Sequence, residues 1–178
     1  MKKSATLIFL CALLLCSGMA QAHGPSRQKV IIKEQIASPP QAVWEAIKDF
    51  HDMSWHPAVV ETQGEGGNSI GAKRVLVLGN GGKIHEKLEK YDSEKHSFFY
   101  RIEEVDVKVL PVTNYSSWVS IKPNGEGGSV VTWKGAFYRG YPNNDPPPEL
   151  SDQAAVEAVT GVYKSGLANL KKLLEQGS

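Results

Sequence analysis

The chain contains very little cysteine. Cys11 and Cys16 are the only two, and both lie within the first 22 residues, which have the features of a leader. Once these residues are removed no thiol remains, which excludes a disulfide framework, a cysteine nucleophile and a zinc–thiolate site. A lipoprotein cleavage box at Cys16 is disfavoured, because such a box requires a small residue before the cysteine and this chain has Leu15.

Residues 1–22 are predicted to be a cleaved signal peptide. Two lysines precede a short apolar run, and Ala20-Gln21-Ala22 is the small-x-small pattern that signal peptidase recognises. We therefore expect an exported protein whose mature chain, residues 23–178, is located in the periplasm. A chain of this length suits one domain.

The mature chain also lacks long apolar runs and an excess of charge. A membrane-spanning helix requires roughly 20 apolar residues, and no run of that length occurs, so we expect no membrane span. Without the two leader lysines, the 20 basic and 19 acidic residues become 18 and 19, which disfavours nucleic acid as a partner. No phosphate-binding loop or nucleophile motif occurs either, and we expect no cofactor.

What the chain does contain is a strand, a helix, a strand-rich middle and a long final helix. Residues 28–36 are β-branched at their centre and predict a strand, after which Ser38 is placed to cap a helix that runs to about Phe50. Between Ser151 and Leu174 the apolar spacing predicts an amphipathic helix capped by Ser151. Glycine and asparagine clusters separate further strand runs at 72–78, 83–91, 96–104, 114–122 and 129–138. The predicted fold class is α+β, with a curved antiparallel sheet wrapped around the final helix.

Alternation along two neighbouring runs places a charge of each sign among apolar residues. Arg74 shares a face with Leu76 in one run, and Glu86 shares a face with Leu88 in the next. Because an unpaired buried charge is very costly, Arg74 and Glu86 should meet across the two strands or contact water. The pair is then either a structural ion pair in a packed core or part of a partly hollow interior that holds a ligand.

Large aromatic residues dominate the inward faces of the other runs. Rings with a few hydroxyl groups suit a pocket for an apolar or aromatic small molecule, and they suit an ordinary core equally well. Tyr163, on the apolar stripe of the final helix, faces the same interior. The strand residues in this group are Phe98, Tyr100 and Ile102 on one run, Tyr115 and Ser117 on the next, and Trp133 and Phe137 on the last.

Several short motifs follow the order of these elements. They are Val43-Trp44 leading to Trp55-His56-Pro57, Gly71-x-x-Arg74, Glu86-x-Leu88, Leu110-Pro111-Val112-x-Asn114-Tyr115, and Trp133. Together they resemble the START-like helix-grip (SRPBCC) superfamily, in its polyketide cyclase and dehydrase branch, over nearly the whole mature chain. Within it, the leader and the Leu-Pro-Val-x-Asn-Tyr stretch look most like the MxaD-type periplasmic proteins of methylotrophic bacteria.

The resemblance implies a helix-grip fold with a ligand-sized cavity between the sheet and the long helix. It implies a lining made of Glu86, Tyr100, Ile102, Tyr115, Trp133, Val159 and Tyr163. It also implies that Gly79 to Gly82 and Leu110 to Val112, including Pro111, are loops at the cavity mouth. The remaining candidate ligand-binding residues, placed by alternation and by their position near the rim, are Arg74, Leu76, Leu88, Phe137 and Trp55.

The resemblance also implies a function. It favours an exported protein that binds a hydrophobic or aromatic small molecule, or acts as an accessory factor between methanol dehydrogenase and its cytochrome, or does both. For the second role we expect an exposed apolar or charged partner surface around Tyr138, Tyr141 and the proline-rich segment 142–148. The alternative is a cyclase- or dehydratase-type enzyme acting on a hydrophobic carbonyl compound in the same cavity. Its acid–base groups would be Glu86, His56 and Tyr100, since a carboxylate in an apolar row can have a raised pKa.

The segment DFHDMSWHP, residues 49–57, is rich in histidine and aspartate. A metal site there would require His51, His56 and a neighbouring aspartate to converge, but the segment lacks the i, i+4 spacing of helical ligand pairs and Pro57 ends the local structure. We therefore expect no metal site. Trp55 and Pro57 are predicted to pack at the cavity rim, and His56 to bond to nearby backbone.

Overall fold

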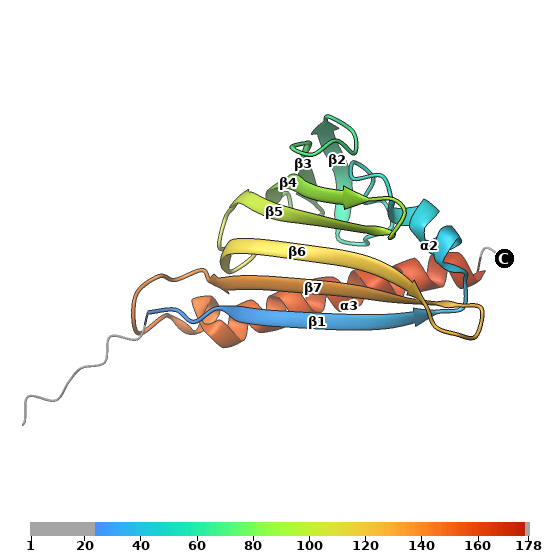
Figure 1. Cartoon of the computed structure of the whole chain (residues 1–178). Coiled ribbons are helices and arrows are strands. Elements are labelled where there is room, and N and C mark those ends of the chain that lie inside the picture. Colours follow the sequence, from blue (N-terminus) through green and yellow to red (C-terminus); the bar gives the residue numbers. More distant parts are fainter. Residues whose placement is uncertain (1–23, 177–178) are drawn as a thin grey trace, which may run out of the picture.

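The computed structural model describes residues 24–176, so the predicted signal peptide lies outside the described residues. Seven antiparallel strands form one curved sheet in the order β1-β7-β6-β5-β4-β3-β2, and a long helix, α3, lies along one face of it (Figure 1). The predicted α+β helix-grip fold is therefore confirmed.

The strands agree closely with the predicted runs, with one addition. The five predicted runs correspond to β3 through β7 to within two residues at each end. The strand without a predicted counterpart is β2, which is mostly exposed at the sheet edge and so shows little of the alternation that identifies a half-buried strand. The bounds are β1 (Gln28–Ile36), β2 (Val59–Glu65), β3 (Lys73–Leu78), β4 (Lys83–Asp92), β5 (Ser97–Val105), β6 (Val112–Pro123) and β7 (Ser129–Arg139).

The first helix, α2 (Pro40–Ile47), is shorter than predicted and is capped differently. Its N-terminus has no side-chain cap, because Ser38 lies one residue too early and is buried against β7, where its carbonyl oxygen accepts a hydrogen bond. The helix does not reach Phe50. The backbone N–H of Phe50 donates instead to the side chain of Asn68, at 2.8 Å, which draws the chain out of the helical path.

The last helix, α3 (Asp152–Gln176), follows a short 3-10 turn, η2 (Pro148–Leu150). The Ser151 hydroxyl accepts a hydrogen bond from the backbone N–H of Ala154 at 3.1 Å, which confirms the predicted cap. Neither helix of residues 24–176 has the length and apolar character needed to cross a membrane. The buried stripe of α3 consists of Ala155, Val159, Tyr163, Gly166, Leu167 and Leu170.

The position of α3 determines where the interior is tightly packed. The helix packs mainly on β1 and β7, whereas β3 and β2 lie at the opposite edge of the sheet, away from it (Figure 1). Strands β3 to β5 are therefore covered on their inner face by the segment 48–58, between α2 and β2, and by the loop that joins β5 to β6. Side chains from these two segments and from α3 meet over the sheet, and the candidate site lies there.

Candidate functional site

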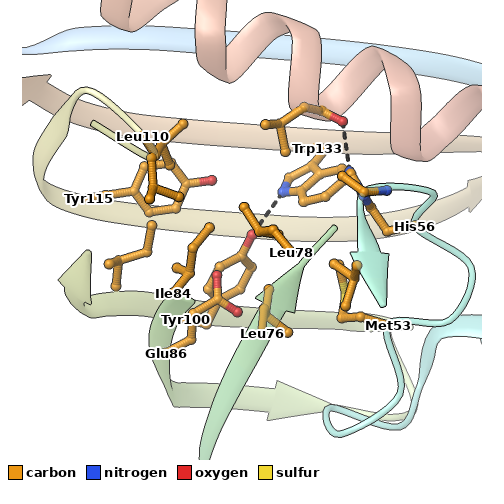
Figure 2. Close-up of a pocket in the computed structure, with 15 residues that line it drawn as sticks. Met53, His56, Leu76, Leu78, Ile84, Glu86, Tyr100, Leu110, Tyr115 and Trp133 are labelled. Atoms are coloured by element: carbon orange, nitrogen blue, oxygen red, sulfur yellow. Dashed lines mark hydrogen bonds between the residues drawn. The ribbon is translucent and has the colours of Figure 1, made fainter. Parts of the chain in front are cut away.

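A cavity of about 80 Å³ lies between the inner face of the sheet and α3 (Figure 2). Several lining residues are only half-buried, so the cavity has an opening to solvent. Its walls are mainly apolar, and a few polar groups reach them. The lining consists of Met53, His56, Ala58, Val59, Leu76, Leu78, Ile84, Glu86, Tyr100, Ile102, Val109, Leu110, Tyr115, Trp133 and Val162.

Arg74 and Glu86 meet across β3 and β4, as alternation predicted. The two residues are paired directly in the strand register, and Arg74 Nε donates to Glu86 Oε2 at 2.6 Å. Arg74 Nη1 also donates to the carbonyl oxygen of Phe50 at 2.6 Å, and the guanidinium lies over the Phe50 ring. Burial raises the pKa of Glu86, and the guanidinium acts in the opposite direction. The pair is therefore a structural ion pair on the side of Arg74, which is enclosed in the core. On the side of Glu86 it borders a hollow interior, because the Glu86 side chain reaches the cavity.

A buried hydrogen-bond network connects the sheet to α3 beside the cavity. The Trp133 indole Nε1 donates to two hydroxyl oxygens, Ser117 Oγ at 2.9 Å and Tyr100 Oη at 3.2 Å. The hydroxyl of Tyr163 lies 3.1 Å from Ser117 Oγ and 2.5 Å from the hydroxyl of Tyr115. Burial raises the pKa of Tyr100 to about 12, and the nearby Glu86 carboxylate adds to this effect. These tyrosines are therefore neutral hydrogen-bonding groups at ordinary pH.

His56 closes the other end of the cavity, with both ring nitrogens engaged. Nδ1 accepts a hydrogen bond from the backbone N–H of Ala58 at 3.2 Å, so Nε2 carries the proton and donates it to the carbonyl oxygen of Val162 at 3.0 Å (Figure 2). Burial lowers the pKa of His56, which keeps the ring neutral. The prediction that His56 bonds to nearby backbone is confirmed for Ala58, and the second bond extends to α3.

Two glycines allow the helix and the sheet to approach at this site. A Cβ on Gly166 would lie 3.0 Å from His56 Nε2, closer still to Cδ2 of the same ring, and 3.1 Å from Trp133 Cζ3. A Cβ on Gly135 would collide with the Tyr163 hydroxyl. Both positions exclude a side chain, and both adjoin residues of the cavity wall or of the network behind it.

The structure brings six of the predicted ligand-binding residues to the cavity and leaves seven in its surroundings. Those that line it are Leu76, Glu86, Tyr100, Ile102, Tyr115 and Trp133. Those that do not are Trp55, Arg74, Leu88, Pro111, Phe137, Val159 and Tyr163.

Two physical causes keep these seven residues out of the cavity lining. Leu88, Phe137, Val159 and Tyr163 are at most 1% exposed, because they lie where neighbouring elements pack tightly and leave no space. Tyr163 stacks on the Trp133 ring at 4.3 Å between centroids and so supports a lining residue from behind.

The other three are held by partners of their own. Arg74 is enclosed by Glu86 and Phe50, as described above. Trp55 packs against the rings of His56 and Trp133, which separate it from the cavity. Pro111 accepts a hydrogen bond from the backbone N–H of Gly140 and is turned toward that neighbour, while the adjacent Leu110 lines the cavity.

Other lining residues were not predicted. Leu78 and Ile84 share inward faces with Arg74 and Glu86, so alternation turns them toward the interior, although it does not mark them as cavity residues. No sequence signal identifies the rest, because they come from irregular segments whose path depends on the whole fold, from the start of the exposed edge strand β2, or from the flank of α3. These residues are Met53, Ala58, Val59, Val109 and Val162.

The histidine- and aspartate-rich segment is a series of local turns. The carboxylates of Asp49 and Asp52 accept hydrogen bonds from the backbone N–H groups of His51 and Ser54, each at 2.8 Å, and His51 Nε2 bonds the carbonyl oxygen of Lys73. Within residues 24–176, no group of three or more histidine, cysteine, aspartate or glutamate side chains is arranged to hold a metal ion. The aspartates stabilise the turns instead.

A protein-family model described as polyketide cyclase / dehydrase and lipid transport matches residues 27–175. None of the curated proteins matches the chain. Among solved structures, XoxI from Bacillus cereus is 28% identical, with a TM-score of 0.70, over 82% of this chain and 94% of that chain. A protein from Nitrosospira multiformis is 27% identical, with a TM-score of 0.68, over 83% of this chain and 96% of that chain.

A more distant similarity concerns an enzyme. Norcoclaurine synthase from Thalictrum flavum, solved in complex with dopamine and hydroxybenzaldehyde, is 16% identical to this chain. The match has a TM-score of 0.64 and covers 86% of this chain and 90% of that chain. At this level of identity the similarity shows the fold alone.

Proposed function

The chain belongs to the polyketide cyclase / dehydrase and lipid transport family, and from that membership we propose that it binds a small, largely apolar molecule in the cavity between the sheet and α3. The observation that carries the proposal is the cavity itself, which is open to solvent and lined mainly by aliphatic and aromatic side chains. Concave, mostly apolar sites with few polar groups are typical of small-molecule binding.

The size of the cavity limits the ligand. An apolar cavity of about 150 Å³ holds one benzene molecule, and the cavity here is about 80 Å³. That volume is about half of the one that holds benzene, so a ligand enclosed entirely in the cavity is smaller than a benzene ring. A ring-sized molecule such as toluene or phenol extends in part through the opening, past half-buried residues such as Leu78 and Val109.

A cavity-filling variant tests this proposal. Val162 lies on α3 and lines the cavity, so Val162→Phe should fill the space and abolish binding of a small apolar probe such as toluene, measured by calorimetric titration. Leu173, on the same helix and 53% exposed, provides the matched control, and Leu173→Phe should leave binding unchanged. Equal binding by both variants would show that the probe occupies some other place.

For the biological role, we propose that the protein is an exported accessory factor in methanol oxidation. Support comes from the leader sequence and from the resemblance to MxaD-type proteins. The exposed segment 142–144 and the half-buried Tyr138 at the end of β7 offer a surface for a partner. The test is the rate of electron transfer from methanol dehydrogenase to its cytochrome, which the purified protein should increase. An unchanged rate across protein concentrations would rule the role out.

A second candidate function, catalysis on a hydrophobic carbonyl compound, has one specific observation in its favour. Glu86 has a raised pKa and shares the cavity with Tyr100, which are the properties of a carboxylic acid–base group and a hydroxyl donor. His56, the third predicted acid–base group, does not fit that role, because both of its ring nitrogens are hydrogen-bonded to backbone groups. Glu86→Gln should abolish turnover if the protein is an enzyme, whereas an accessory factor with this substitution would still increase the electron-transfer rate.

A further inference from the structure

The polar groups of the cavity identify the chemical class of its ligand, provided that the proposed binding function holds. Only one oxygen of the Glu86 carboxylate is engaged, since Oε2 accepts from Arg74 Nε. Oε1 makes no hydrogen bond with any residue of the described chain, and the Glu86 side chain lines the cavity (Figure 2). The cavity therefore contains a hydrogen-bond acceptor without a donor.

The direction of the tyrosine network leaves one donor in the cavity that Glu86 also lines. Ser117 Oγ donates to the carbonyl oxygen of Lys134, so the Tyr163 hydroxyl must donate to Ser117, and the Tyr115 hydroxyl must donate to Tyr163. Tyr100 takes no part in this chain and only accepts, from Trp133 Nε1. The hydroxyl groups of Ser117 and Tyr115 lie near enough to lower the pKa of Tyr100, but both are already engaged in the network above, so the Tyr100 proton is the one available to a ligand.

The remaining lining offers no competing polar group. The ring nitrogens of His56 are both occupied, and Trp133 Nε1 is already shared between two acceptors. The other lining side chains, apart from Tyr115, are hydrocarbon or thioether groups. One acceptor, Glu86, and one donor, Tyr100, thus project into an otherwise apolar space.

We propose that the cavity recognises a small neutral molecule with an apolar body and a hydroxyl group, which donates to Glu86 Oε1 and accepts from the Tyr100 hydroxyl. A hydroxyl is the simplest group that satisfies both, because it is donor and acceptor at one atom. A ketone would accept from Tyr100 but would leave Glu86 Oε1 without a donor. An anion would be repelled by Glu86, and a cation would be placed near the buried charge of Arg74.

Two pairs of matched probes test the proposal. Phenol and toluene have the same shape and differ in a hydroxyl against a methyl group, and cyclopentanol with methylcyclopentane forms the corresponding non-aromatic pair. In a wholly apolar cavity the hydroxyl would lose its water and bind more weakly than the methyl. Here the hydroxyl member of each pair should bind about tenfold more tightly, because both of its hydrogen bonds are restored.

Single-atom variants assign the effect to the two residues. Tyr100→Phe should reduce phenol affinity by about tenfold while leaving toluene affinity unchanged, and the fold should tolerate it because Trp133 keeps Ser117 as an acceptor. Tyr138→Phe, on β7 and outside the cavity lining, is the matched control and should change neither affinity. Glu86→Gln should also reduce phenol binding, because it replaces the free acceptor or disturbs it.

The outcomes separate this proposal from the binding function on which it rests. If toluene binds and phenol binds more weakly, the cavity is an apolar site and the hydroxyl inference is overturned. If neither member of either pair binds, the proposed binding function itself fails. A preference for phenol that persists in Tyr100→Phe would also overturn the assignment, since the hydroxyl would then be recognised elsewhere.

Discussion

Replacing Gly166 by alanine should destabilise the protein, although alanine favours helices. In an exposed helix interior, glycine to alanine stabilises by about 1 kcal/mol. At Gly166 the new methyl group would meet the His56 ring, which two hydrogen bonds hold in place, and would lie 3.1 Å from Trp133. Neither ring is a flexible chain end that can move aside. Overpacking of this kind costs about 1–3 kcal/mol.

The same helix contains its own control. A Cβ on Gly161 would meet nothing within 4 Å, so Gly161→Ala should show the helix-propensity gain alone, about 1 kcal/mol. For Gly166→Ala the same gain is offset by the overpacking cost, so its stability should range from about that of the wild type to 2 kcal/mol below it. The two variants should therefore differ by about 1–3 kcal/mol in the free energy of unfolding.

Urea denaturation, followed by circular dichroism, measures this difference. Because Gly166 positions the rings that line the cavity, Gly166→Ala should also weaken toluene binding, and Gly161→Ala should not. If Gly166→Ala is as stable as Gly161→Ala, the His56 ring is not fixed between the helix and the loop. The description of that cavity wall would then be wrong.

Three further predictions concern the surroundings of the cavity. Arg74→Met should lower the free energy of unfolding by about 3–5 kcal/mol, because it leaves Glu86 buried and unpaired. The double change Arg74→Met with Glu86→Leu should recover most of this loss in urea denaturation. No recovery would contradict the pairing of the two residues. Gly135→Ala should destabilise the protein less in a Tyr163→Phe background than in the wild type, because that background lacks the obstructing hydroxyl. A double-mutant cycle should give a coupling free energy of about 0.5–3 kcal/mol between the two positions. Strict additivity of the two substitutions would refute the contact. Burial lowers the pKa of His56 below its ordinary value of 6.5. Below pH 6.5 the unfolded chain therefore binds more protons than the folded chain, and the free energy of unfolding decreases as the pH falls. Thermal melts at a series of pH values should show a smaller loss in His56→Gln than in the wild type, and equal losses would exclude this histidine as the cause.

The regular elements could be predicted from the sequence because their periodicity is local. The period of two along β3 and β4 is exact, so it placed Arg74 and Glu86 on the inward face, and short hairpins then set them opposite each other. The helical period and the Ser151 cap identified α3 in the same way. The end of α2 was not predictable in this sense, because it depends on Asn68, a residue distant in sequence.

The lining of the cavity was predicted only in part, and the reason is geometric. Alternation says that a side chain points inward, but not whether another element lies directly against it. Phe137 and Val159 lie where the sheet and α3 are in contact, so they are fully packed. Ile102 and Leu78 lie where the helix is farther away, so their side chains border open space. That distance is a property of the whole fold and has no signature in a single run.

The central claim, that the space between the sheet and α3 admits a small molecule, is tested most directly by a methyl NMR titration with phenol. Saturable shifts should appear in the methyl groups of Leu76, Ile84 and Val162, which line the cavity. The methyl groups of Ile31 and Ile70, which are 53% and 63% exposed at the surface, should not move. Shifts confined to the surface methyl groups, or no saturable shift at all, would show that the interior is closed to ligands.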